Sequence, residues 1–129
     1  MVSWLVKGML KKRVHVEAAR VLVMGITYKK NYPDLRNTRV IDIVKELAEY
    51  NIEVDVYDPW VSAAEAPHEY GIESIDQPKP ARYDGVILAV GHSKFKEMGA
   101  TGIRAMAKPV GVIYDLKYIL SSNESYIRL

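Results

Sequence analysis

The sequence predicts an α/β fold in which one doubly wound domain, built on a mostly parallel sheet, is preceded by a short helix. Two observations lead to this prediction. Short segments that are apolar at every position recur along the chain, which is typical of parallel strands covered on both faces. Segments with apolar residues at helical spacing lie between them, and this alternation indicates an open α/β sheet. The length of 129 residues suits one such domain.

Continuous apolar runs and one alternating run define the predicted strands. The expected strands are residues 20–25, 53–57, 85–91 and 111–115, with a brief edge strand at residues 72–75. The alternating run is stopped by Asp58 and Pro59, because the residue before a proline favours an extended or turn conformation. Ligands of open α/β sheets bind at the carboxyl ends of the strands, so the loops after Gly25, Tyr57, Val90 and Asp115 are the candidate binding loops.

Apolar residues at helical spacing predict the first two helices, capping signals predict the third, and a short fourth helix follows. The expected helices are residues 2–13, 40–48, 62–71 and 99–106. Asn51 can adopt the left-handed conformation that ends the second helix, and Ser62 and Glu65 have the spacing of a capping box at the start of the third. Phe95, Met98 and Met106 are expected to fill the core.

The composition excludes several classes of function. Cysteine is absent, so the chain holds no disulfide, no thiolate metal ligand and no cysteine nucleophile. The 18 basic and 16 acidic residues are mixed along the chain and leave a formal net charge of +2, which predicts no nucleic-acid partner. No apolar run approaches the roughly 20 residues of a membrane span, and no secretory signal opens the sequence, so a cytoplasmic protein without a membrane partner is expected.

A long basic loop follows the first strand. Residues 25–39 exceed the roughly 2 to 6 residues of an ordinary βα loop, and they hold Lys29, Lys30, Arg36 and Arg39. Next to a helix N-terminus, such cations suit a diphosphate, and Tyr28 could stack on a base. The alternative is a solvated basic loop whose charges keep the domain soluble.

Two other functions fit the alternating topology less well. A Rossmann domain that binds NAD(P) needs a glycine-rich turn, but Gly25 is followed by no glycine until Gly71. Asp58, the possible ribose-binding acid, is then better explained as a turn residue that ends a strand. A phosphorylation-receiver domain needs acidic residues where Met24 and Val90 stand, so it ranks last.

The histidines do not indicate a catalytic or metal site. His92 follows a core strand at the ligand-bearing edge, but no carboxylate is adjacent in sequence to orient its ring, so a loop-capping role is favoured. His15 and His68 are expected to have no role. No pair of histidines has metal-ligand spacing with a third partner, so no metal is predicted.

Three motifs in order resemble a known family. Residues 21–29, with Ile26-Thr27-Tyr28-Lys29 after the strand, are followed by the Pro-Asp-Leu-Arg-Asn-Thr segment at 33–38 and the Val-Asp-Val-Tyr-Asp-Pro segment at 54–59. From about residue 11 to 116 this pattern resembles the C-terminal UDP-binding domain of the UDP-glucose/GDP-mannose dehydrogenase family. The sequences of these motifs are most similar to those of bacterial members that oxidise UDP-N-acetylglucosamine or UDP-N-acetylgalactosamine at C6 for surface polysaccharides.

The resemblance implies roles for four residues. Tyr28 and Lys29 would contact the nucleotide sugar, and Arg36 would reach the NAD held by another domain of the parent protein. The family has a substrate-binding arginine after the last strand, and Lys117 stands near that place here. The resemblance thus implies three substrate-binding residues and one cofactor-binding residue.

The resemblance also implies how the chain is organised. Residues 1–18 would be the end of the central dimerisation helix with its linker, and residues 19–129 would bind the UDP-sugar. The glycine-rich NAD site and the catalytic lysine, asparagine and cysteine belong to the NAD-binding and central domains of the family. We therefore expect no catalytic residue in this chain, no oxidation by the chain alone, and a homodimeric NAD-dependent parent enzyme.

Overall fold

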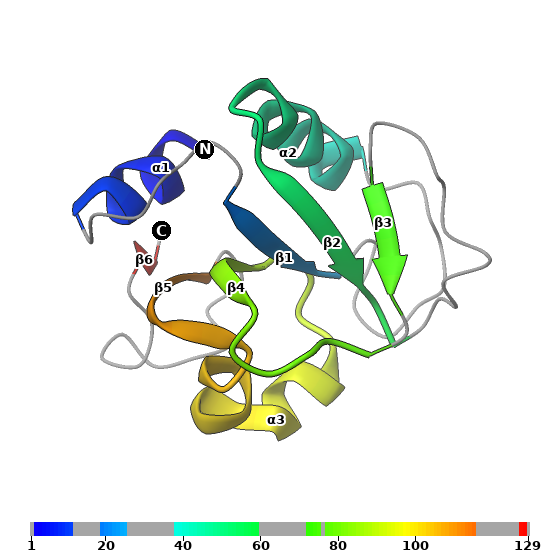
Figure 1. Cartoon of the computed structure of the whole chain (residues 1–129). Coiled ribbons are helices and arrows are strands. Elements are labelled where there is room, and N and C mark those ends of the chain that lie inside the picture. The colour runs from blue at the N-terminus through cyan, green and yellow to red at the C-terminus, as the bar shows by residue number, and fades with distance from the viewer. Residues whose placement is uncertain are drawn as a thin grey trace.

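The computed structural model of the chain describes residues 2–11, 19–25, 38–59, 72–75, 77–115 and 127–128. Along the chain, the elements are α1 (Val2–Lys11), β1 (Arg20–Met24), α2 (Thr38–Glu49), β2 (Glu53–Tyr57), β3 (Ile72–Ile75), β4 (Tyr83–Leu88), α3 (Ser93–Arg104), β5 (Ala107–Asp115) and β6 (Ile127–Arg128). The strands form one sheet in the order β3-β2-β1-β4-β5-β6, and every neighbouring pair is parallel (Figure 1). The predicted α/β class with a parallel sheet is therefore confirmed.

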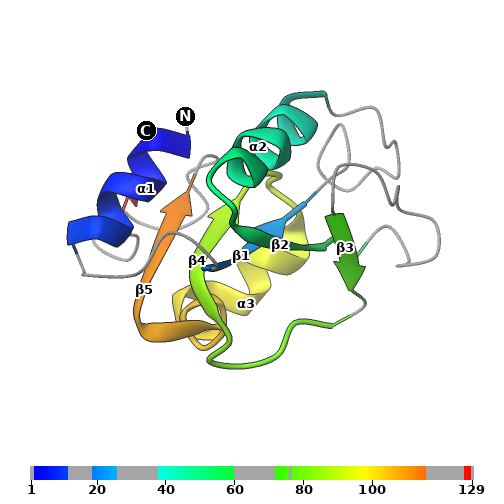
Figure 2. The same cartoon turned by 45° about the horizontal axis from the view of Figure 1, so that its top comes forward.

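Helices cover both faces of the sheet. α1 and α2 lie on one face and α3 lies on the other (Figure 1, Figure 2). Successive residues of β1 point to opposite layers: Val21 and Val23 pack in the core under α1 and α2, whereas Leu22 and Met24 pack in the core under α3. A strand buried on both sides needs apolar residues at every position, which is the pattern of this segment.

The strand order reverses between β1 and β4. From β1 the sheet extends through β2 to β3 on one side, and it extends from β4 through β5 to β6 on the other. Ligands of such sheets bind beside the point of reversal, outside the carboxyl ends of the strands. The fold therefore directs attention to the ends of β1, β2 and β4.

The helices predicted at residues 2–13 and 40–48 are present as α1 and α2. The apolar positions of α2 at Val40, Ile43, Val44 and Leu47 are all buried against the sheet. Asn51 follows α2 with a φ of 59°, so the predicted left-handed helix end is confirmed. α1 buries Leu5 and leaves Leu10 exposed, as expected for a helix that packs one face on the sheet.

α3 begins earlier than the helix predicted at residues 99–106. It starts at Ser93, and at Gly99 the backbone leaves the helical region with φ 65° and ψ −179° before helix resumes. The first half was missed because its only apolar residues are Phe95 and Met98, too few to show a helical period. Phe95, Met98 and Met106 all pack in the core under α3, as predicted.

β5 begins earlier than predicted because its first residues form an irregularity. Tyr83 pairs with Ala107, but Gly85 pairs with Val112, so extra residues of β5 bulge out between the two pairs. Arg104 donates from Nη1 to the carbonyl oxygen of Gly111 at 2.6 Å and from Nη2 to that of Pro109 at 2.8 Å. The guanidinium at the end of α3 thus supports the bulged segment.

Smaller differences concern the ends of elements. The strand predicted at residues 85–91 spans Tyr83–Leu88, and a short strand at Ile127–Arg128 was not predicted because the tail around it is polar. The edge strand expected at residues 72–75 is confirmed. The helix predicted at residues 62–71 lies outside the described residues.

Candidate functional site

The end of β1 is bonded to the strands on both of its sides. The N–H of Gly25 donates to the carbonyl oxygen of Tyr57 at 2.8 Å. The carbonyl oxygen of Met24 accepts from the N–H groups of Ala89 at 3.0 Å and Val90 at 3.3 Å. The point where the basic loop leaves the sheet is therefore held between the ends of β2 and β4.

Gly25 is required at this point by its backbone and by its surroundings. Its φ is +104°, a conformation that residues with a β-carbon rarely adopt. A β-carbon placed on Gly25 would stand 2.5 Å from the β-carbon of Val90 and 3.0 Å from the Val90 nitrogen. The loop therefore begins with a glycine because the chain passes directly against the end of β4.

Asp58 and His92 form a buried pair at the same edge. Nε2 of His92 lies 2.9 Å from Oδ2 of Asp58, and the two side chains are 0% and 1% exposed. Asp58 directly follows β2, so it does end a strand as predicted, but its carboxylate points into the protein rather than toward solvent. The carboxylate that orients His92 comes from another strand end, which is why it is not adjacent in sequence.

His92 occupies the position before the first residue of α3, where a capping side chain is common. Its side chain makes no capping hydrogen bond. Its carbonyl oxygen instead accepts from the N–H groups of Phe95 at 3.0 Å and Lys96 at 3.4 Å. The ring therefore does not cap α3; the backbone carbonyl oxygen meets the first turn of the helix while the ring turns inward to Asp58.

Aromatic contacts fix the orientation of the His92 ring. The ring meets Phe95 edge to face with the centroids 5.3 Å apart, and Phe95 lies at a tilt to Tyr57 with the centroids 6.1 Å apart. Such edge contacts between aromatic rings are favourable beyond the area they bury. Tyr57, Phe95 and His92 thus connect the end of β2 with the start of α3.

The ligand-binding residues expected from the sequence lie outside the described residues. Tyr28, Lys29 and Arg36 follow β1 by way of Gly25, and Lys117 follows β5 by way of Asp115. Asp115 is fully buried and pairs with Leu88 of β4. The two segments that carry the expected residues therefore start from the carboxyl edge of the sheet, which is where the sequence predicts a ligand.

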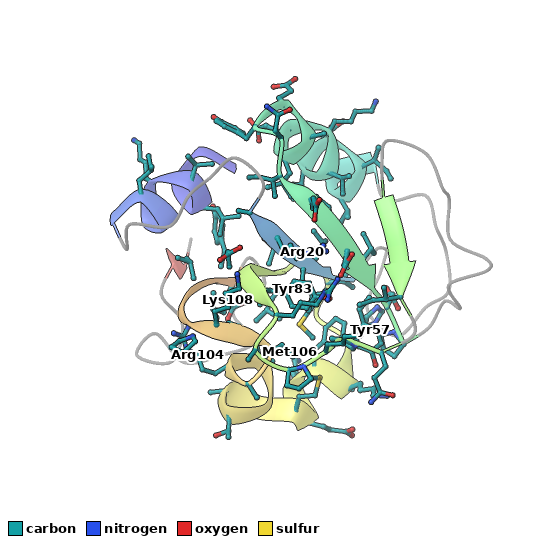
Figure 3. All side chains as sticks on the ribbon, in the orientation of Figure 1. Arg20, Tyr57, Tyr83, Arg104, Met106 and Lys108 are labelled. Atoms are coloured by element: carbon teal, nitrogen blue, oxygen red, sulfur yellow. The ribbon has the colours of Figure 1, made fainter. Side chains whose placement is uncertain are left out.

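Opposite charges pair around the amino ends of the strands. Arg20 and Glu53 form an ion pair at 2.9 Å, and Lys108 lies 3.2 Å from Asp84. The backbone N–H of Arg20 also donates to Asp84 Oδ2 at 2.9 Å. Arg20 and Lys108, labelled in Figure 3, are the first residue of β1 and the second residue of β5. These cations face carboxylates, so this edge is a poor site for an anionic ligand.

Tyr83 completes the polar cluster at that end. The hydroxyl of Tyr83, which is labelled in Figure 3, donates to Asp55 Oδ2 at 2.7 Å. Arg82 Nε lies 3.7 Å from the same oxygen. Burial raises the pKa of the Tyr83 hydroxyl above its ordinary value, and the hydrogen bond and negative charge of Asp55 raise it further. Tyr83 thus stays protonated and keeps a carboxylate satisfied inside the sheet.

The structure gives no sign of two other kinds of site in the part of the chain that it describes. Among those residues, no three histidine, cysteine or acidic side chains gather in a group that could hold a metal ion. None of the described helices has the length and apolar character needed to span a bilayer.

Comparison with known proteins identifies the family. The sequence pattern of the "UDP-glucose/GDP-mannose dehydrogenase family, UDP binding domain" matches residues 22–122. The chain belongs to this family. The match includes the carboxyl end of β1 and all of β2 and β4, and therefore the edge formed by Gly25, Asp58 and His92. The family predicted from the motifs after the first and second strands is confirmed.

Relatives within the family are similar over nearly the whole chain. The chain is 62% identical over 128 residues to the UDP-N-acetyl-D-glucosamine 6-dehydrogenase of Pseudomonas aeruginosa. The aligned region covers 99% of this chain and 30% of that protein. The chain is 50% identical over 125 residues to the enzyme of the same name from Salmonella typhi, covering 97% of this chain and 29% of that protein. The chain thus spans less than a third of the length of these family members.

A solved structure in the family has the same fold. The UDP-glucose dehydrogenase of Pyrobaculum islandicum superposes with a TM-score of 0.70 at 22% identity, over 98% of this chain and 28% of that chain. The doubly wound arrangement is therefore the fold of UDP-sugar dehydrogenase domains.

The buried pair is the feature that the sequence did not reveal. Asp58 and His92 were each considered alone, as a turn residue and as a capping residue. The available signal was that both directly follow predicted strands, whose carboxyl ends meet at one edge of a parallel sheet. A histidine and an aspartate in such positions are candidates for contact even when they are far apart in sequence.

Proposed function

We propose that residues 19–129 form the UDP-sugar-binding domain of an NAD-dependent UDP-sugar 6-dehydrogenase, a soluble cytoplasmic enzyme of surface polysaccharide biosynthesis. The parent oxidises C6 of a UDP-hexose or UDP-N-acetylhexosamine to the uronic acid. Membership of the family supports a UDP ligand. Two relatives named UDP-N-acetyl-D-glucosamine 6-dehydrogenase favour the N-acetylhexosamine as the substrate class.

The burial of Asp58 against His92 is the observation that favours this proposal over an NAD-binding domain. In a dinucleotide-binding fold, the acid at the end of the second strand reaches the ribose of the cofactor. Asp58 stands at that place, but its side chain is 1% exposed and lies 2.9 Å from His92. A carboxylate buried against an imidazole does not hold a ribose, so this edge suits a nucleotide bound by other groups.

Those other groups are side chains of the basic loop and of the segment after β5. Lys29 neutralises the diphosphate and Tyr28 stacks on the uracil, while Lys117 contacts the same substrate from the other loop. The basic loop leads to the start of α2 at Thr38, and a helix N-terminus favours an anion because its first N–H groups lack helical partners. Cations and a helix start thus act on the same diphosphate.

Arg36 acts on the cofactor instead. The planar guanidinium can fork onto the pyrophosphate of an NAD molecule that is held by the NAD-binding domain of the parent. The two oxidation steps at C6 would each transfer one hydride, to two NAD molecules in succession, and the nucleophile would be a cysteine of the central domain. The present chain holds the UDP end, so its contribution to catalysis is orientation of C6 by remote binding energy. The parent is a homodimer joined through the central domain.

A calorimetric titration of the 129-residue chain tests the proposal. UDP is expected to bind, and NAD at the same concentrations is expected to give no measurable heat of binding. Binding of NAD without binding of UDP would favour a Rossmann domain for NAD(P) and would refute the proposal.

A further inference from the structure

Asp58 and His92 belong to the two segments that flank the carboxyl end of β1. β1 pairs with β2 on one side and with β4 on the other. Asp58 directly follows β2, and His92 follows the turn that leaves β4. The 2.9 Å contact between His92 Nε2 and Asp58 Oδ2 therefore joins both neighbours of β1 beyond its end.

The same two segments determine where Gly25 lies. The Gly25 N–H donates to the carbonyl oxygen of Tyr57, the residue before Asp58. The space beside Gly25 is filled by Val90, which precedes His92 by two positions in the sequence. A change in the spacing of the two segments would therefore move Gly25. Because residues 26–37 continue from Gly25, their starting point depends on the pair.

Helix capping does not explain why histidine occupies position 92. His92 has φ −57° and ψ 142° at the N-cap of α3, a backbone conformation in which serine, threonine, aspartate or asparagine would cap the helix. The histidine side chain forgoes that bond and turns inward. Buried polar pairs are also poor sources of stability, since apolar residues of similar volume often serve as well. The pair is better explained by the geometry that it imposes.

We propose that Asp58 and His92 are positioning residues for the UDP site: their bond sets the spacing of the ends of β2 and β4, and so the place from which the basic loop starts toward the nucleotide. This inference rests on the proposed function, since it assumes that the loop after Gly25 binds UDP. Neither residue contacts the ligand in this arrangement. Both act through Gly25.

Two amide substitutions at one position test the inference. In His92→Gln the amide nitrogen reaches about as far as Nε2 and can donate to Asp58, whereas in His92→Asn it corresponds to Nδ1 and falls short. Both variants remove the ring that contacts Phe95. His92→Asn places a favoured capping residue at the start of α3, which helps to keep that variant folded.

The measured quantity is the dissociation constant of UDP for the folded 129-residue chain. His92→Gln is expected to bind UDP within about twofold of the unaltered chain. His92→Asn is expected to bind about tenfold more weakly, because a small displacement of binding groups has effects of that size or larger. Rescue by glutamine but not by asparagine identifies the bond to Asp58 as the cause.

Tyr83→Phe is the matched control. It removes another buried hydrogen bond to an aspartate of β2, the 2.7 Å bond to Asp55, but the donor belongs to the amino end of β4 and not to the carboxyl edge that holds Gly25. Its stability is expected to fall while its UDP affinity stays within about twofold of the unaltered chain. Equal loss of UDP affinity in Tyr83→Phe and His92→Asn would overturn the positioning role, because general loosening would then explain both.

The outcomes separate the two proposals. If the unaltered chain binds UDP and the two His92 variants bind it equally well, the positioning role is wrong and the proposed function stands. If the unaltered chain binds no UDP, the proposed function fails and the inference fails with it. Should His92→Asn not fold, the paired change Asp58→Leu with His92→Phe removes the bond without leaving a buried charge, and unchanged UDP affinity there overturns the inference.

Discussion

Gly25 and Val90 lie so close together that a β-carbon on Gly25 would stand 2.5 Å from the β-carbon of Val90. Gly25→Ala therefore combines a clash with an unfavourable positive φ of 104°. We expect it to lower the free energy of unfolding by about 2–5 kcal/mol, the sum of backbone strain and overpacking. Urea denaturation followed by circular dichroism measures the loss.

Gly99→Ala is the control for backbone strain alone. Gly99 has a φ of 65°, but no atom lies within 4 Å of the place where its β-carbon would stand. We expect this variant to lose only about 1–3 kcal/mol, the cost of holding alanine in a positive-φ region that essentially only glycine adopts. Equal losses in the two variants would show that contact with Val90 does not determine the identity of residue 25.

The raised pKa of the Tyr83 hydroxyl predicts a loss of stability at alkaline pH. Because its pKa is raised in the folded state, the unfolded chain releases this proton from about pH 10 while the folded chain still holds it. Above about pH 10 the unfolded state thus binds fewer protons, and the free energy of unfolding falls as the pH rises. Tyr83→Phe lacks this decrease.

The experiment compares the free energies of unfolding of the unaltered chain and Tyr83→Phe between about pH 7 and pH 11. At pH 7 the variant is expected to be less stable by about 1–2 kcal/mol, because Asp55 loses a hydrogen bond inside the protein. The difference should shrink as the pH passes about 10. A constant difference across this range would contradict a raised pKa for Tyr83.

Lys29 and Arg36 are expected to differ in their effect on UDP. Lys29→Ala should weaken UDP binding to the chain by about 1.5–3 kcal/mol, the scale of a charge-assisted hydrogen bond. Arg36→Ala should leave that affinity nearly unchanged, since its proposed partner is NAD on another domain. Calorimetric titrations of both variants make the comparison, and a loss in Arg36→Ala as large as that in Lys29→Ala would refute the role of Arg36.

Much of the fold was predictable because the core pattern is local. The run from Val21 to Met24 is buried on both faces, and the apolar spacing of α2 is read directly from Val40 to Leu47. The first half of α3 and the start of β5 were missed. In α3 few residues are apolar, and in β5 the bulge at Pro109 is supported by Arg104 from another element, which no local pattern reports.

The candidate site was predictable only in its place. The predicted ends of the strands located the candidate binding loops at the carboxyl edge of the sheet, and the motif after β1 indicated the family. The contact between Asp58 and His92 joins residues 34 positions apart. It depends on the strand order that places β1 between β2 and β4, and strand order does not follow from the sequence of any single strand.

A ¹H–¹⁵N NMR titration of the 129-residue chain with UDP tests most directly whether the carboxyl edge of this sheet holds the nucleotide. We predict that the amide signals of Gly25, Val90 and His92 shift as UDP is added. Those of Glu53 and Lys108, at the amino ends of the strands, should stay in place. Shifts confined to the amino ends, or no shifts at saturating UDP, would contradict a UDP site at the ends of β1, β2 and β4.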